Sequence, residues 1–153
     1  MKTQTTTTIN ERGEILAALL KFAGQRPRLE FVNYGKPYST VAYRAEVRTI
    51  TARLRDARKL LHAVEMRPGI SAADIKEGFR AFSGRLSWDG KRLEYCTGQY
   101  WPTEYRAAVC AVLVRVLWAH FRACAPTGTA NRGEYIRNAA IRLLGRPLAN
   151  RWF

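Results

Sequence analysis

The sequence predicts a mainly α-helical protein, a compact domain of about five helices with one small β-hairpin. Apolar residues recur at helical spacing over several long stretches, and glycine and proline end these stretches. An Asp-Gly pair between two short apolar runs is typical of a hairpin. With 153 residues and a hydrophobic fraction of 47%, the chain can bury a sizeable core. We expect residues 9–153 to form a single basic domain and residues 1–8 to form a disordered lead.

The first expected helix begins at Thr8 or Asn10, either of which can cap it, and it ends at Gly24. Apolar and polar residues then alternate over 28–34, which predicts a short strand. Asn33, Gly35 and Pro37 are typical of a turn after that strand.

The clearest helix is expected over 39–65. Its apolar residues follow one another at alternating spacings of three and four, which places them in one stripe that we expect to face the core. The stripe consists of Tyr43, Val47, Ile50, Leu54, Ala57, Leu61 and Val64.

The second half of the chain has its own start and stop signals. Ser71 and Asp74 form a capping box for a helix over 71–83, and Asp89-Gly90 connects the strands of the hairpin. The most apolar segment, 103–124, predicts the central core helix. A last helix over 132–144 ends at Gly145, with a short basic tail behind it. The expected core consists of Tyr43, Val47, Ile50, Leu54, Leu61, Phe79, Phe82, Val109, Leu113, Val116 and Leu117.

An alternative fold is α+β, with an N-terminal part that is arranged like a winged helix. In that arrangement the helix over 71–83 reads a groove through Lys76 and Arg80, and Lys91 and Arg92 lie at the tip of the wing. The length of the helix over 39–65 argues against it.

The charge indicates a polyanionic partner. The chain has 26 Lys and Arg against 12 Asp and Glu, a formal net charge of +14, and 20 of the 26 cations are arginine. Arginine binds phosphate through two parallel hydrogen bonds. An arginine-rich surface is equally typical of a GC-rich genome. The ratio of arginine to lysine alone therefore does not decide between phosphate recognition and genome composition.

One face of the helix over 39–65 carries cations of a single sign. At about 100° per residue they lie roughly 115° from the apolar stripe, in a line along which a phosphate backbone could run. The acids Glu46 and Asp56 fall away from this face. It consists of Arg44, Arg48, Arg55, Arg58 and Lys59, with His62 among them.

Two further clusters are candidates for nucleic-acid contact. Around the hairpin, Arg85, Lys91 and Arg92 are candidate phosphate contacts, and Tyr100, Trp101 and Tyr105 are candidate platforms for stacked bases. In the C-terminal third, a second phosphate-facing patch is expected from Arg137, Arg142, Arg146 and Arg151.

Catalytic and metal signatures are scarce. No phosphate-binding glycine loop or nucleophile elbow occurs, and His62 and His120 lack ligand spacing, so we expect no catalytic residue, metal or cofactor. His120 and the three cysteines are expected to be buried in a protein of the reducing cytoplasm. Arg115, His120 and Arg122 interrupt the apolar segment 107–125, so we expect no membrane span.

We therefore expect a non-catalytic RNA- or DNA-binding protein, a small subunit of a larger nucleoprotein complex with other protein subunits as partners. A second interpretation is a small inhibitor of mobile-element or phage type that docks its basic face on an acidic protein. A third is a small metal-dependent nuclease that uses residues 85–106.

Overall fold

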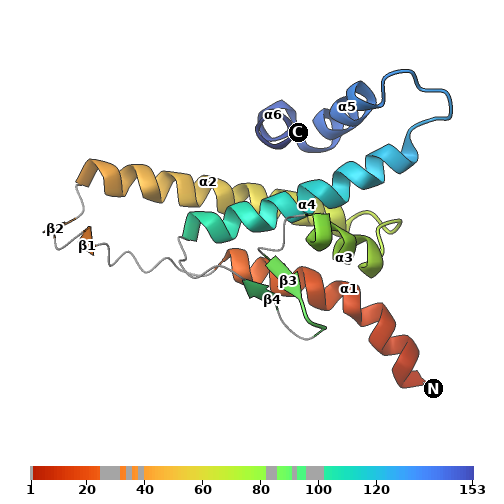
Figure 1. The fold of residues 1–153 in the computed structure, drawn as a ribbon, viewed down its shortest axis with the longest axis horizontal. Helices are drawn as coiled ribbons and strands as arrows, with labels where there is room; N and C mark the ends of the chain where they lie inside the picture. Colours follow the sequence, from red (N-terminus) through yellow and green to blue (C-terminus); the bar gives the residue numbers. More distant parts are fainter. Residues whose placement is uncertain are drawn as a thin grey trace.

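A computed structural model describes the backbone of residues 2–24, 32–33, 36–37, 40–81, 86–90, 93–95 and 102–153. It describes the side chains of residues 11–24, 48–49, 51–80, 86–90, 93–94 and 106–153. Within these residues the elements are α1 (Lys2–Ala23), β1 (Val32–Asn33), β2 (Lys36–Pro37), α2 (Thr40–Glu65), α3 (Ala72–Ala81), β3 (Leu86–Trp88), β4 (Leu93–Tyr95), α4 (Pro102–Cys124), α5 (Arg132–Leu144) and α6 (Arg146–Trp152) (Figure 1).

The mainly α class with a hairpin near residue 90 is confirmed. Strands β3 and β4 pair antiparallel, with Trp88 opposite Leu93, and Gly90 in the turn has a positive φ of 99°. Strands β1 and β2 pair over two residues each, so a second small hairpin lies where the sequence predicted a strand and a turn.

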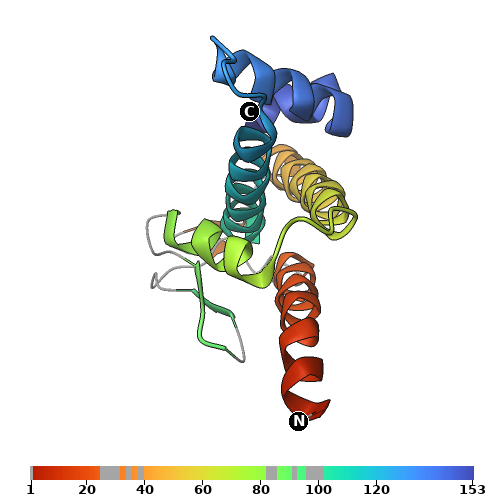
Figure 2. The same cartoon turned by 90° about the vertical axis from the view of Figure 1, so that its right-hand side faces the viewer.

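Helices α2 and α4 lie side by side and run in the same direction (Figure 1). Helix α1 runs the opposite way beneath them, α3 packs on α4, and α5 and α6 lie together near the end of α4 (Figures 1 and 2). The core lies among these helices, and its largest fully buried side chains are Ile15, Leu19, Leu60, Ile70, Ile75, Leu86, Leu113, Leu117 and Leu148.

The expected core is confirmed where side chains are described, except that the buried side of α2 is rotated relative to the predicted stripe. Leu61, Phe79, Val109, Leu113, Val116 and Leu117 are buried. Leu54 is only partly buried, whereas Leu60, outside the predicted stripe, is fully buried. Tyr43, Val47, Ile50 and Phe82 lie outside the described side chains.

Two helix boundaries differ from the expectation. Helix α1 begins at Lys2, so it includes residues 2–8, because elongation of a nucleated helix adds a hydrogen bond for each residue. Residues 146–152 form α6 rather than a tail. Pro147 lies in the first turn of α6, where a proline removes no helical hydrogen bond.

The capping box before α3 is confirmed. The backbone N–H of Ser71 donates to Asp74 Oδ2 at 2.8 Å, and the N–H of Asp74 donates to Ser71 Oγ at 3.3 Å. Gly78 then lets α3 approach α4 closely. A Cβ at this position would lie 2.6 Å from Val116 Cγ2 and 3.2 Å from the carbonyl oxygen of Val112.

Arg12 and Arg106, which are not among the candidate phosphate contacts, bind the carboxyl ends of helices. Arg12 Nη2 donates to the carbonyl oxygens of Val64 at 2.6 Å and Arg67 at 2.9 Å, at the end of α2. The buried Arg106 donates through Nε to the carbonyl oxygen of Ala23 at 2.6 Å, at the end of α1. Terminal carbonyls have no partner within their own helix, so these cations have a structural role.

The segment Arg106–Cys124 of α4 is long and apolar enough to cross a membrane by length and composition alone, although Arg115, His120 and Arg122 interrupt it. The core helix of a soluble protein meets the same criterion, and α4 packs against α1, α2, α3 and α5. One such helix is weak evidence for a membrane span.

Candidate nucleic-acid interface

The exposed side of α2 carries the candidate cations. Arg48, Arg55, Arg58, Lys59 and His62 are all exposed. They lie along about 21 Å of the helix, from the first to the last of them, at 1.5 Å per residue. No exposed carboxylate occurs among the described side chains from 48 to 62. We call these five residues the α2 basic face.

The α2 basic face lies farther from the core than the sequence predicted. The buried side of α2 is centred on Ala57, Leu60 and Val64. At about 100° per residue this side lies roughly opposite Arg55 and His62, at about 180° rather than 115°. The whole width of the α2 basic face is therefore available to a partner.

Asp56 connects α2 to the C-terminal helix. It is 3% exposed and accepts hydrogen bonds from Arg151 Nε at 2.9 Å, Arg151 Nη2 at 2.7 Å and Trp152 Nε1 at 2.9 Å. Burial by itself raises the pKa of Asp56. The hydrogen bonds from Arg151 and Trp152 and the charges of Arg151 and Lys59 outweigh it, so the pKa lies below the ordinary 3.8.

This contact changes the interpretation of one candidate. Arg151 was expected to face phosphate, but its guanidinium holds Asp56 through two hydrogen bonds, which leaves it less able to bind phosphate. Arg137 is exposed and donates to Asn150 Oδ1 at 3.1 Å. Arg142 and Arg146 are exposed on α5 and α6.

An open pocket of about 560 Å³ lies between the α2 basic face and the end of α5. Arg58, Lys59 and His62 contribute its polar side. Its apolar side consists of Ala63, Met66, Leu143 and Leu144. We call this cavity the α2–α5 pocket, and no aspartate or glutamate lines it.

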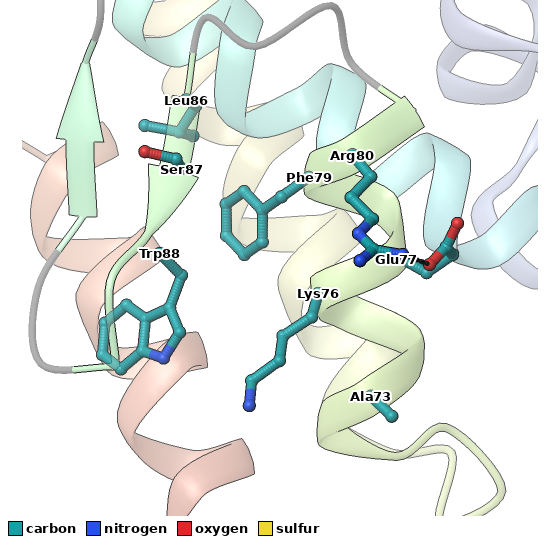
Figure 3. A pocket seen from close by; sticks show the side chains of 8 residues that line it. All are labelled: Ala73, Lys76, Glu77, Phe79, Arg80, Leu86, Ser87 and Trp88. Atoms are coloured by element: carbon teal, nitrogen blue, oxygen red, sulfur yellow. Dashed lines mark hydrogen bonds and ion pairs between the residues drawn. The ribbon is translucent and has the colours of Figure 1, made fainter.

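A pocket of about 570 Å³ between α3 and β3 has a different electrostatic character (Figure 3). Phe79 and Trp88 form apolar walls, and Lys76 and Arg80 rise from α3. Each cation has an acidic partner, since Lys76 pairs with Glu11 and Arg80 pairs with Glu77 at 3.4 Å. The positive charge of this pocket is thus largely balanced, and the groove-reading role of the winged-helix alternative gains no support from it.

An aromatic residue that is not among the predicted stacking platforms lies exposed on α4. Trp118 is 38% exposed, and the guanidinium carbon of Arg122 lies 5.4 Å from the centroid of its ring system. Helical spacing places Arg115, Trp118 and Arg122 on one side of α4. In the sequence, the sign of this exposed side was that two arginines interrupt an otherwise apolar helix.

Several candidates lie outside the described side chains. They are Arg44, Arg85, Lys91, Arg92, Tyr100, Trp101 and Tyr105.

The described histidines and cysteines form no evident reactive centre. His120 is half-buried, with Nε2 at 3.4 Å from Arg67 Nη1 and 3.7 Å from Cys124 Sγ. Burial lowers the pKa of His120, and the charge of Arg67 lowers it further. Burial raises the pKa of Cys110 to about 12. Cys124, the last residue of α4, is exposed rather than buried.

Metal ligands do not gather in the part of the chain whose residues are described. No group of three His, Cys, Asp or Glu side chains there could hold a metal ion.

Comparison with known proteins gives no relative: no family model matches the chain, and neither the curated proteins nor the solved structures contain a match.

Proposed function

We propose that this protein is a non-catalytic nucleic-acid-binding protein that holds a phosphate backbone along α2. The observation that carries the proposal is the single sign of the exposed charges among the described side chains of α2 from 48 to 62, ahead of the exposed Glu65 at the end of the helix. Arg48, Arg55, Arg58 and Lys59 are exposed opposite the buried side of the helix, and no exposed acid interrupts them between 48 and 62. A solvated helix face ordinarily mixes both signs.

The spacing of these cations supports contact with a linear polyanion. Arg48 and Arg55 are two turns apart on the same side, and Arg58 and Lys59 follow one turn later. Each cation that neutralises a phosphate releases condensed counterions, so binding should weaken steeply with salt. None of these four side chains is needed for the core.

Binding of labelled single- and double-stranded RNA and DNA across a salt series tests the proposal. Five phosphate contacts from α2, Arg44 included, predict a slope of log K against log salt of about −3.5 for single strands or about −4.5 for duplex. A slope near zero, or no binding at low salt, would contradict the proposal.

Docking on an acidic protein surface would use the same cations, and the experiment separates the two. In that case the oligonucleotides bind weakly and with little difference between variants of the α2 basic face. A labelled acidic polypeptide then binds tightly, with an association rate that falls with salt.

A further inference from the structure

The α2–α5 pocket lies directly beside the proposed phosphate track. Arg58, Lys59 and His62 belong both to the α2 basic face and to the lining of this pocket. A strand that follows the cations therefore passes the mouth of an apolar cavity. The positive charge at the pocket between α3 and β3 is instead largely balanced, because its two cations are paired with carboxylates.

The lining of the α2–α5 pocket has the chemistry that holds an unstacked base. Met66, Leu143 and Leu144 supply apolar surface, and Met66 is 67% exposed. The imidazole of His62 and the guanidinium of Arg58 are planar groups of the kind on which bases stack in protein complexes with single-stranded nucleic acid. The cavity of about 560 Å³ is within the usual range for ligand pockets, which is about 300–1,000 Å³.

A duplex does not offer its bases to such a cavity, because they are stacked and paired inside the helix. A single strand exposes them while its phosphates recur along the backbone. The α2–α5 pocket beside the α2 basic face thus matches a single strand, because a single strand can place its phosphates on the cations and a base in the pocket at the same time.

We propose that the ligand is a single-stranded nucleic acid and that one of its bases occupies the α2–α5 pocket while the neighbouring phosphates contact the α2 basic face. This inference rests on the proposed function and adds the strandedness of the ligand and the site of one base.

Oligonucleotides that share phosphates but differ in bases test this directly. The probes are labelled oligothymidylate and oligouridylate of about 12 nucleotides, the duplex of the former with oligoadenylate, and an abasic deoxyribose-phosphate chain of equal length. We expect the better-bound single strand to bind about fivefold or more tightly than the abasic chain and the duplex, which corresponds to the contribution of one stacked base.

A matched pair of neutral substitutions locates the base. Met66→Gln removes apolar surface from the pocket, and Leu20→Gln makes the same kind of change at a side chain that is 41% exposed on α1. We expect Met66→Gln to weaken single-strand binding about threefold to tenfold through lost apolar contact. It should leave the abasic chain, the duplex and the salt slope unchanged, and Leu20→Gln should change none of them.

The possible outcomes separate the inference from the proposed function. If the abasic chain and the duplex bind as well as the single strands, or if Met66→Gln weakens all probes equally or none, the inference is overturned while the proposed function stands. If no probe binds at low salt, the proposed function fails and takes the inference with it. Tight, Met66-dependent binding of an acidic peptide instead would assign the pocket to a protein partner.

Discussion

Arg151 and Asp56 are 95 positions apart in the chain and are joined by two parallel hydrogen bonds, Nε to Oδ2 at 2.9 Å and Nη2 to Oδ1 at 2.7 Å. The two partners differ in exposure, since the Arg151 side chain is 52% exposed and that of Asp56 is 4% exposed. Loss of the arginine would leave the buried carboxylate with the hydrogen bond from Trp152 alone. Loss of the aspartate would leave a guanidinium that water can solvate.

Arg151→Met should therefore destabilise the protein by about 1.5–3 kcal/mol, the usual range for hydrogen bonds to a charged group, because Asp56 then keeps only the hydrogen bond from Trp152. Chemical denaturation measures the change. Arg142→Met, at an exposed arginine of α5, is the control and should stay within about 0.5 kcal/mol of the wild type. Equal effects of the two substitutions would mean that the Asp56 contact contributes nothing to folding.

The same contact predicts a dependence on acid. Because the pKa of Asp56 is lowered in the folded state, its ionised form contributes stability at pH values above the ordinary 3.8. This contribution is lost as the pH falls through the lowered pKa. Unfolding of the wild type and Asp56→Asn, followed from about pH 7 to about pH 3, should show a free-energy difference that is constant above about pH 5 and shrinks below about pH 4. A difference that persists unchanged at the acid end would contradict the assignment.

The buried side of α2 predicts a ranking of two leucines. Leu60 is fully buried and Leu54 only partly buried. Leu60→Ala should cost about 2–5 kcal/mol through lost transfer energy and the cavity left behind, and Leu54→Ala should cost clearly less. Thermal and urea denaturation of both variants measures the ranking. The reverse order would place the core on the stripe that the sequence predicted.

Two helical glycines should respond to alanine in opposite directions. Gly78→Ala places a Cβ 2.6 Å from Val116 Cγ2 and should destabilise by about 1–3 kcal/mol, in spite of the better helix propensity of alanine. Gly13→Ala meets nothing within 4 Å and should stabilise α1 by up to about 1 kcal/mol. Melting temperatures that rise in both variants would show that α3 and α4 are not in close contact.

The helical elements could be predicted because their signals are local. Ser71 and Asp74 mark the start of α3, Gly24 and Gly145 follow the ends of α1 and α5, and Asp89-Gly90 marks the hairpin. Each signal acts within a few residues of the element that it bounds. Helix α6 was missed because Pro147 indicates a helix end as readily as a first turn.

The candidate interface was predicted only in part, because long-range pairing decides the role of each cation. The positions of Arg48, Arg55, Arg58 and Lys59 on one side of α2 follow from helical spacing. Nothing in the local sequence separates Arg151, which holds Asp56, from the exposed Arg146. The α2–α5 pocket brings Met66 to Leu143, two residues that no local pattern connects.

The phosphate track proposed along α2 is tested most directly by the salt dependence of nucleic-acid binding in the double variant Arg48→Gln/Arg55→Gln. Glutamine keeps helix propensity close to that of arginine, and both side chains are exposed, so folding should change little. Arg80→Gln/Arg132→Gln removes the same charge from α3 and the start of α5 and serves as the matched control. In Arg48→Gln/Arg55→Gln we predict weaker binding to every nucleic-acid sequence and a slope of log K against log salt that is flatter by about 1.4–1.8 units, because two phosphate contacts are lost. The control should show little change in either quantity. Binding that is unchanged at every salt concentration, or an equal change in both variants, would contradict a phosphate track along α2.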